Sequence, residues 1–437
     1  MDVVYYETII VGAGAAGLYC ACSLDGGAES SALVLEKNKK AGRKLLMTGN
    51  GHCNVTHGGS IKEFIGHYAD KGSRIRGILQ RYNNRQLCDF LESIGVPLTE
   101  REDGKVFPAS MDSADVLNSL LREIERKGIA VKYGSEVIRI EPFAGGEKDS
   151  ESRFTIYTPK KSYRCQNLVI ATGGCSYAGT GSDGKMLNIL SRDLNIDIEE
   201  PRPVLTPVYV EDYEFGDLSG VSFRNIEAYI ETEDGKRLRG FAGDLLFTSK
   251  TLSGPAILNN SRYMRPGMIL SVNFLTPADE PKITERFKRD FPGNGRSPQT
   301  YMSENLGLPK RFAQAIACKL SVSDRKVSQL TGKQMRSLSE VLTGYKFKIR
   351  KLGGFSEAMA TGGGVSLCHK TSAVMEHEVH KGLYFIGEAV DVDGDTGGYN
   401  LQFAYSSAKA AAHNISAGEF CGEQKNKCDG RPMTRQL

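Results

Sequence analysis

The sequence lacks several features that mark other classes of protein. Among its 437 residues, no apolar run is long enough to cross a bilayer and no basic segment precedes an apolar one at the start, so neither a membrane span nor a signal peptide is predicted. The ten cysteines never form a C-x-x-C pair, which argues against a dithiol redox motif and a zinc site. The nucleophile motif G-x-S-x-G is also missing, so nothing supports a hydrolase. We therefore expect a cytoplasmic protein that has no metal site and does not bind membranes.

The composition is that of an ordinary globular protein, but its charge is unevenly spread. Hydrophobic residues make up 40% and charged residues 25% of a chain long enough for two or three domains. Residues 281–350 contain 15 Lys+Arg against 5 Asp+Glu, a local charge of +10 in a chain whose net charge is +4. We favour a solvated helical face for this stretch. The alternative is a docking site for an anion, such as nicotinamide-cofactor phosphates, an acidic substrate or nucleic acid.

The most informative motif is a glycine-rich turn near the start of the chain. A strand-like apolar run leads into G-A-G-A-A-G at residues 12–17, and an Ala/Leu-rich helical segment follows. Gly12 permits the tight turn, Gly14 lets the backbone approach a diphosphate, and Gly17 lets the helix pack closely on the strand. A second apolar run ends at Glu36, which is placed to accept hydrogen bonds from ribose hydroxyls. Together these features predict a dinucleotide-binding βαβ unit.

Two further glycine clusters follow apolar runs, as expected of a domain that holds FAD. In Thr172–Gly174 the glycines permit close approach of the backbone to a cofactor, and a plain turn is the alternative. The second cluster begins with Gly387-Glu388 and ends at Gly398–Asn400, where a glycine pair starts a helix. The N-terminus of that helix can direct N–H groups and partial positive charge at the pyrimidine edge of an isoalloxazine ring.

A glycine- and asparagine-rich segment at residues 41–54 suits a loop over a phosphate and a flat polar ring. It contains Arg43 and Lys44, and also His52 and Cys53, whose side chains can act as an acid or base and as a nucleophile. No partner for His52 or Cys53 is visible in the sequence, so we interpret both as packing or hydrogen-bonding residues of a tight loop.

The predicted elements define an α/β protein with an insertion. We expect a Rossmann-like FAD-binding domain interrupted by a small antiparallel β-barrel and a helical subdomain. The expected ranges are 1–193 for the first part of the FAD-binding domain, 194–280 for the barrel, 281–345 for the helical insert, 346–418 for the second part of the FAD-binding domain and 419–437 for a disordered tail. Within the first part, separate strands are predicted at 163–165 and 168–171. No second G-x-G-x-x-G unit precedes a helix, so no dedicated nicotinamide domain is encoded, although NAD(P)H can still dock transiently over a flavin.

With these motifs in place, the chain resembles the BaiN-type flavoproteins, a family of NAD(P)/FAD-dependent oxidoreductases that includes 3-dehydro-bile-acid reductases and aminoacetone oxidases. The resemblance spans Gly12 to about Ala412. It rests, in order, on GAGAAG, KLLMTGNGHCN, VFPAS, ATGGCSYAGTGS, LLFTSKTLSGPAIL, ATGGGVSL and GEAVDVDGDTGGYNLQFA. It implies FAD as the cofactor and a FAD domain interrupted by a barrel and a helical piece.

The resemblance also implies which residues hold FAD. The glycine loop is expected on the diphosphate, Glu36 on the adenosine ribose, the backbone of Val137 beside the adenine, and the remaining residues around the ribityl chain and ring. The expected cofactor-binding residues are Gly12, Gly14, Ala16, Gly17, Glu36, Arg43, Lys44, Thr48, Asn50, Gly51, Cys53, Asn54, Val137, Thr172, Gly173, Gly174, Gly387, Glu388, Gly398, Tyr399, Asn400 and Leu401.

The chain departs from the family pattern at four positions. The family usually has arginine at the positions of His52 and Lys105, proline at Ala178 and glycine at Thr251. The first two changes remove guanidinium forks, so recognition of the substrate can differ from that of relatives.

The resemblance therefore predicts an FAD-dependent oxidoreductase that takes hydride from NAD(P)H and reduces an activated C=C bond in a flat apolar substrate, such as a dehydro-steroid or bile acid. Tyr177, Tyr399 and His52 are the candidate proton donors. One alternative is an FAD-dependent oxidase of a small amine such as aminoacetone. Another is an RNA-linked flavoprotein that uses the basic 281–350 region, although the aromatic residues expected of a single-strand binder are sparse there, so nucleic acid is the less favoured partner. The oligomeric state stays open.

Overall fold

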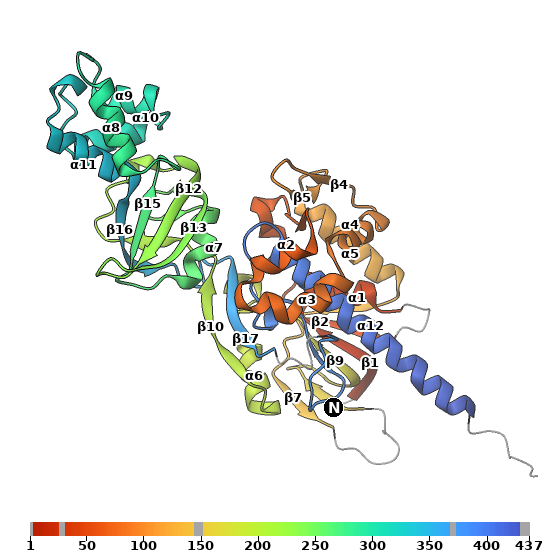
Figure 1. Cartoon of the computed structure of the whole chain (residues 1–437). Coiled ribbons are helices and arrows are strands. Elements are labelled where there is room, and N and C mark those ends of the chain that lie inside the picture. Colours follow the sequence, from red (N-terminus) through yellow and green to blue (C-terminus); the bar gives the residue numbers. More distant parts are fainter. Residues whose placement is uncertain (1–2, 26–30, 144–151, 368–372, 429–437) are drawn as a thin grey trace, which may run out of the picture. The chain divides into compact units, whose positions relative to one another are not determined.

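The computed structural model describes residues 3–25, 31–143, 152–367 and 373–428, and the chain divides into two compact units. The first unit combines Met1–Arg202 with Ala360–Leu437, and the second contains Pro203–Met359 (Figure 1). The final helix, α12, spans Tyr399–Cys428 and so extends into the segment expected to be a disordered tail. The rest of that segment, residues 429–437, lies outside the described residues.

The first unit is built on a seven-stranded sheet in the order β6-β2-β1-β9-β8-β7, with β18 also paired to β9. The strands are β1 Val3–Val11, β2 Ala32–Glu36, β6 Ala130–Tyr133, β7 Arg139–Pro142, β8 Phe154–Tyr157, β9 Ser162–Ile170 and β18 Leu383–Phe385. The neighbours β6, β2, β1, β9 and β18 run parallel, whereas β7 and β8 add an antiparallel edge. Every residue of β2 is buried, as in a parallel sheet covered on both faces. The predicted Rossmann-type α/β fold is confirmed.

One strand differs from the sequence prediction. The segments 163–165 and 168–171 were expected as separate strands, but residues Ser162–Ile170 form the single strand β9. Its first half pairs with β8 and its second half with β18, while β1 follows it along the other side. The change from alternating to continuous apolar sequence therefore marks a change of neighbour within one strand.

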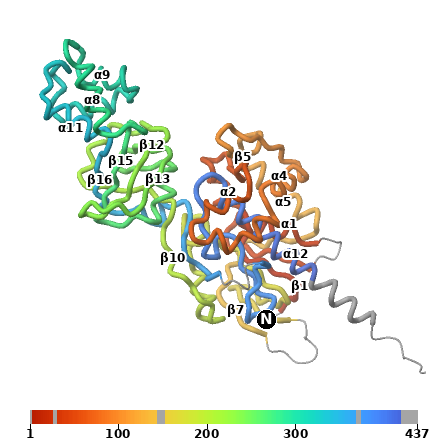
Figure 2. The backbone as a smooth tube through the Cα atoms, viewed as in Figure 1, coloured from red at the N-terminus to blue at the C-terminus, as the bar shows by residue number. Residues whose placement is uncertain are grey.

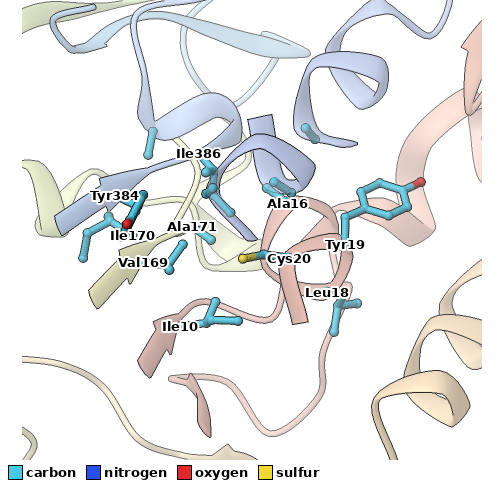
Figure 3. Close-up of a cluster of buried hydrophobic side chains, with 14 of the residues drawn as sticks. Ile10, Ala16, Leu18, Tyr19, Cys20, Val169, Ile170, Ala171, Tyr384 and Ile386 are labelled. Carbon is cyan, nitrogen blue, oxygen red and sulfur yellow. The ribbon is translucent and has the colours of Figure 1, made fainter. Parts of the chain in front are cut away.

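Helices cover the sheet of the first unit and close its core. Helix α1 (Ala15–Ser23) packs against α12 and α5 (Ser113–Arg126), and its buried side chains meet those of β1, β9 and the strand end at Ile386 (Figure 3). Asp112 is the N-cap of α5, since its carboxylate accepts a 2.8 Å hydrogen bond from the Ala114 N–H. The remaining elements of this unit are α2 Ile61–Ile65, α3 Gly72–Arg81, α4 Asn84–Ser93, α6 Lys185–Leu194, β3 Thr56–His57, β4 Leu98–Glu100, β5 Lys105–Pro108, β10 Ile198–Val204 and β17 Ala360–Val365.

The second unit contains the expected antiparallel barrel, which is closed in the order β11-β14-β13-β12-β15-β16. Its strands are β11 Val208–Val210, β12 Ser222–Glu231, β13 Arg237–Phe247, β14 Leu252–Ser253, β15 Ile269–Asn273 and β16 Tyr345–Leu352. Figure 2 shows the backbone of β12, β13, β15 and β16. The second part of the FAD-binding domain was expected from residue 346, but β16 pairs with β15 and β11 and closes the barrel. The chain returns to the first unit only after Met359, because the barrel needs this sixth strand to satisfy its edges.

The helices of the second unit share the core of the barrel. These helices are α7 Pro255–Asn260, α8 Glu280–Asp290, α9 Pro298–Asn305, α10 Lys310–Lys319 and α11 Gly332–Thr343. Phe312 of α10 packs against Phe274 and Phe223, with ring centroids 4.6 and 4.8 Å apart. No helix in the described parts of either unit has the length and apolarity that a membrane span requires.

Candidate dinucleotide-binding site

The glycine-rich turn between β1 and α1 has the backbone that its sequence predicts. Gly12 has a φ of +106°, and a Cβ on it would lie 2.6 Å from the Ala171 carbonyl oxygen. A Cβ on Gly17 would lie 1.9 Å from the Gly12 carbonyl oxygen, so both positions need glycine for packing. Gly14 is different: it precedes α1, and no heavy atom lies within 4 Å of its Cβ position. The open space is therefore at the helix N-terminus, where a diphosphate would bind.

Glu36 is fixed beside this turn at the end of β2. Its side chain is buried, with Oε2 accepting a 2.8 Å hydrogen bond from the Ala13 N–H and Oε1 accepting 2.7 Å bonds from the backbone and side chain of Asn38. Arg43 donates from Nη1 to the Asn38 side-chain oxygen at 3.1 Å. A carboxylate has about four lone-pair positions, so Glu36 keeps acceptor capacity for ribose hydroxyls. Asn38 is a member of this cluster that the motifs did not indicate.

Lys44 and Glu388 are distant in the sequence and form an ion pair in the structure. The Lys44 ammonium lies 2.6 Å from Oε2 of Glu388, and Oε1 of Glu388 accepts a 2.7 Å hydrogen bond from the Thr361 N–H. The Thr361 hydroxyl oxygen in turn accepts hydrogen bonds from the backbone of Cys175 and Ser176. This network brings together three of the predicted glycine-rich segments.

The Thr172–Gly174 turn follows β9 inside the same network. A Cβ on Gly174 would lie 2.5 Å from the Thr361 side chain, and one on Gly173 would lie 2.6 Å from the Ser182 hydroxyl. The Thr172 hydroxyl oxygen is buried and has no hydrogen-bond partner among the described residues. A buried hydroxyl without a protein partner is uncommon and is accounted for when a ligand supplies the missing bond.

The loop at residues 48–54 is wound tightly. Gly49, Asn50 and Gly51 have φ values of +56°, +56° and +89°, and Cys53 has +57°. The Thr48 hydroxyl donates to a backbone carbonyl at 2.7 Å. Burial raises the pKa of the Cys53 thiol to about 11, against a smaller lowering by its hydrogen bond with Thr48. Cys53 is therefore a neutral thiol at physiological pH and packs in the core.

The start of α12 is tied to this loop and to the segment before it. With its amide oriented to satisfy both ends, Asn54 donates to two backbone carbonyls and accepts a 3.2 Å hydrogen bond from the Gly398 N–H. The Asn400 side chain accepts from the Gly394 N–H at 2.8 Å and donates to the Gly394 carbonyl at 2.9 Å. Leu401 follows in the first turn of the helix and is partly buried.

Two further predicted cofactor-binding residues lie in closely packed surroundings. A Cβ on Gly387 would lie 2.7 Å from the Cβ of Ala16, so the glycine lets the end of β18 approach α1. Val137 is buried in the connection between β6 and β7, where the nearby Ser135 N–H donates to the Glu36 carbonyl at 2.9 Å. Val137 therefore follows, by two residues, a backbone hydrogen bond to Glu36.

The three candidate proton donors are not joined to one another. His52 is exposed, and its Nδ1 lies 2.7 Å from the Met111 carbonyl oxygen. Tyr177 has a φ of +55° and is partly exposed, whereas Tyr399 is only 4% exposed. Burial raises the pKa of Tyr399 well above its ordinary value, with smaller contributions from nearby carboxylates. In the described part of the chain, no hydrogen bond or ring contact links any two of the three.

The structure adds a polar cluster around Tyr399 that the motifs did not reveal. The His67 ring stacks on Tyr399 at 4.1 Å, and its Nδ1 lies 3.1 Å from Oδ2 of Asp395. Nearby, the Lys71 ammonium is 2.6 Å from Asp391, which also accepts a 2.8 Å bond from the Gly363 N–H. The spaced aspartates before the Gly397-Gly398 pair are the sequence signal for this cluster. They do not identify its other members, because His67 and Lys71 come from the helical region after β3.

Taken together, the open position at Gly14, the anchored Glu36 and the unpartnered Thr172 hydroxyl fit a dinucleotide of the FAD type. The fold and this site define a Rossmann-type oxidoreductase with a flavoprotein architecture and an inserted barrel. Comparison with known families then gives a specific assignment. The chain belongs to the HI0933-like family, whose Rossmann-domain profile matches residues 6–414.

Three curated relatives cover nearly the whole chain. The chain is 31% identical to a ribosomal RNA dihydrouridine synthase of Haemophilus influenzae over 94% of this chain and 99% of that protein. It is 31% identical to a protein of the same name from Escherichia coli, over 95% and 99% of the two chains. It is 26% identical to a 3-dehydro-bile acid delta(4,6)-reductase of Clostridium scindens, over 92% and 97%.

Proposed function

We propose that this protein is an FAD-dependent reductase of a carbonyl-conjugated C=C bond and that its substrate is a uridine in RNA. The observation that carries the substrate assignment is the 31% identity, over almost the whole length of both chains, to two proteins named ribosomal RNA dihydrouridine synthase. Forming dihydrouridine saturates the C5=C6 bond of uracil, which is conjugated to the C4 carbonyl. The sequence prediction of an activated C=C bond therefore fits this substrate without change of chemistry.

A bile-acid-like substrate is the second candidate. It was the substrate first suggested by the sequence, and it is supported by the 26% identity to the Clostridium scindens reductase. Saturating an enone in a steroid and saturating uracil both place a hydride on the carbon β to a carbonyl and a proton on the α carbon. The two proposals differ in what must be recognised, a rigid apolar ring system or a base within a polyanion.

In this mechanism the residues of the first unit bind and orient the cofactor. The N–H groups at the start of α1 would neutralise the diphosphate and Glu36 would accept hydrogen bonds from ribose hydroxyls, while the Lys44–Glu388 pair stabilises the turn after β9. The chemistry that FAD supplies when bound is the transfer of two electrons as hydride, with NAD(P)H as the proposed reductant. Overall, NAD(P)H and one proton are consumed, the C=C bond becomes a CH–CH bond, and NAD(P)⁺ is released.

A side chain of this protein must also hold the proton that the α carbon receives. Tyr177, Tyr399 and His52 remain the candidates, and His67 joins them because it stacks on Tyr399 and is oriented by Asp395. We include a cytoplasmic setting in the proposal, on the basis of the scattered cysteines.

Supplying each proposed substrate to the purified holoprotein tests the function. Under anaerobic conditions, NADH or NADPH should bleach the flavin absorbance, and unmodified ribosomal RNA should then restore it with formation of dihydrouridine, detected by mass spectrometry of the digested RNA. Restoration by a 3-oxo-Δ4 steroid but not by RNA would select the second candidate. Turnover of aminoacetone with O₂, without bleaching by either nicotinamide, would instead support an amine oxidase.

A further inference from the structure

We propose that a pocket on the barrel of the second unit binds a phosphate group of the RNA substrate, with Arg239 and Arg265 as the phosphate ligands. This inference rests on the proposed function for the identity of the strand. The pocket has a volume of about 390 Å³, near the lower end of ligand pockets, and suits a single nucleotide better than an extended ligand. It is lined by Ile230, Leu238, Arg239, Arg262, Tyr263, Arg265 and Met268.

The lining combines arginines with an apolar floor and contains no acidic residue among the described residues. Arg239 and Arg265 are exposed, whereas Arg262 is 9% exposed and makes contacts of its own. Leu238 beside them is 48% exposed. Guanidinium groups next to an exposed apolar surface match a nucleotide of an RNA strand, since one part of the ligand is a monoanionic phosphodiester and the other is a flat base.

The two guanidinium groups are held in place before a ligand arrives. Arg239 lies with its guanidinium carbon 4.0 Å from the centroid of the Tyr263 ring, and its Nε donates to the Asn260 side-chain oxygen at 3.1 Å. Arg265 donates from Nη1 to the backbone carbonyls of Arg262 and Met264, at 3.1 and 2.7 Å. A guanidinium has five N–H donors, so each group keeps donors for a phosphate. Because the side chains are already ordered, less conformational entropy is lost on binding.

About half of the basic residues at 281–350 lie within ion-pair distance of an acidic neighbour. Within the basic stretch that the sequence indicated, ion pairs join Lys282 to Asp279, Arg286 and Arg289 to Asp290, Arg296 to Glu304, Lys319 to Glu214 and Lys348 to Glu233. On β13 itself, Arg237 is only two residues before Arg239 and lies 3.5 Å from the Glu231 carboxylate. The paired residues fit the solvated-face interpretation, and the arginines that line the barrel pocket are the better candidates for an anion site.

The charge of the whole unit supports attraction of a polyanion. Residues 203–359 contain 23 lysines and arginines against 17 aspartates and glutamates, a net charge of +6 in a chain whose total is +4. The positive charge is thus concentrated in the unit that carries the arginine pocket. A field of this sign increases the rate at which RNA is encountered, and a pre-ordered arginine pair then fixes one phosphate.

The test compares two double variants with a matched control on the same strand. R239A/R265A removes both phosphate ligands, R239K/R265K keeps the charge but not the planar fork, and R237A removes a neighbouring arginine that is paired with Glu231. Binding of a ribosomal RNA fragment to each FAD-loaded protein is measured by fluorescence anisotropy at several salt concentrations. Melting temperature and flavin absorbance confirm that each variant is folded.

We expect R239A/R265A to bind RNA about tenfold more weakly and to lower the slope of log K against log salt by about 1, with the lysine variant intermediate and R237A near wild type. Equal binding by R239A/R265A and R237A overturns the proposal. Failure of the wild-type protein to bind the fragment also overturns it. So does a rise in the KM for NADPH in R239A/R265A with no change in RNA binding, which would assign the pocket to a nicotinamide phosphate.

Inorganic phosphate and product analysis keep this proposal separate from the proposed function. Phosphate added at constant ionic strength should compete with RNA on the wild-type protein and have little effect on R239A/R265A. RNA binding that depends on the pocket, without formation of dihydrouridine, would support the phosphate site and contradict the reductase function. Equal formation of dihydrouridine by wild type and R239A/R265A at limiting RNA would support the reductase function and contradict the phosphate site.

Discussion

Replacing Gly14 with alanine should separate cofactor binding from protein stability. Gly14 has φ and ψ of −80° and −176°, which alanine adopts without strain, and nothing lies within 4 Å of its Cβ position. Alanine lowers the entropy of the unfolded chain, a gain of about 0.4–1 kcal/mol, but it is a poorer helix N-cap than glycine by a similar amount. We therefore expect the free energy of unfolding of the apoprotein to change by less than about 0.5 kcal/mol.

The same substitution should weaken the binding of FAD. If the diphosphate lies over Gly14, a methyl group occupies part of its space, and we expect the Kd for FAD to rise about tenfold, or about 1.4 kcal/mol. At an FAD concentration 100 times the wild-type Kd, the ligand stabilises the wild-type protein by about 2.7 kcal/mol. A tenfold weaker Kd leaves about 1.4 kcal/mol of that stabilisation. The difference is measurable by chemical unfolding with and without FAD.

Gly17→Ala is the matched control. Its Cβ would lie 1.9 Å from the Gly12 carbonyl oxygen, so α1 must move away from β1 whether or not FAD is present. We expect the apoprotein to lose about 1–3 kcal/mol of stability, as in other overpacked sites. FAD titration followed by flavin fluorescence and urea unfolding of both apoproteins give the comparison. Wild-type FAD affinity in Gly14→Ala, or a stability loss equal to that of Gly17→Ala, would refute the placement of the diphosphate.

Three further predictions concern other parts of the first unit. Burial raises the pKa of Cys53 to about 11. At pH 8, iodoacetamide should therefore label the exposed Cys318 and leave Cys53 unmodified in the folded protein, as measured by peptide mass spectrometry. Labelling of Cys53 at a rate similar to that of Cys318 would contradict its burial. Burial lowers the pKa of Lys71, but its bond to Asp391 outweighs this and raises the pKa above 10.5, so the pair stabilises the fold fully below that pH and loses its effect as the pH rises through the raised value. Lys71→Met should cost about 3 kcal/mol because it leaves the buried Asp391 carboxylate without its counter-ion. Lys105→Met at the exposed pair with Asp103 should cost less than about 1 kcal/mol. Equal costs in urea unfolding would contradict this reasoning. Tyr177→Phe should lower turnover about 100-fold without slowing flavin reduction by NAD(P)H, as expected for loss of a proton donor. Tyr399→Phe should lower turnover less, because Tyr399 is buried in an aromatic cluster. The opposite order of the two variants in stopped-flow assays would identify Tyr399 as the donor.

Local sequence was sufficient wherever one short segment sets its own structure. The G-A-G-A-A-G turn, the N-cap of α5 at Asp112 and the apolar run of β2 all depend on residues close together in the chain. The division of β9 was wrong because its apolar pattern changes where its neighbour changes from β8 to β18. The strands that pair with a given strand can be distant in the sequence, so the pattern of one strand does not identify them.

The sequence by itself determined the class of this protein, because the contact of Gly17 with Gly12, the open position at Gly14 and the acid at Glu36 all act within one βαβ unit. Only the tertiary structure decided which distant groups meet. The Lys44–Glu388 pair, the cluster of His67, Asp395 and Tyr399, and the arginine pocket each join residues from separate elements. The physical reason is that ion pairs and pockets depend on distances of a few ångströms, which folding sets and spacing along the chain does not.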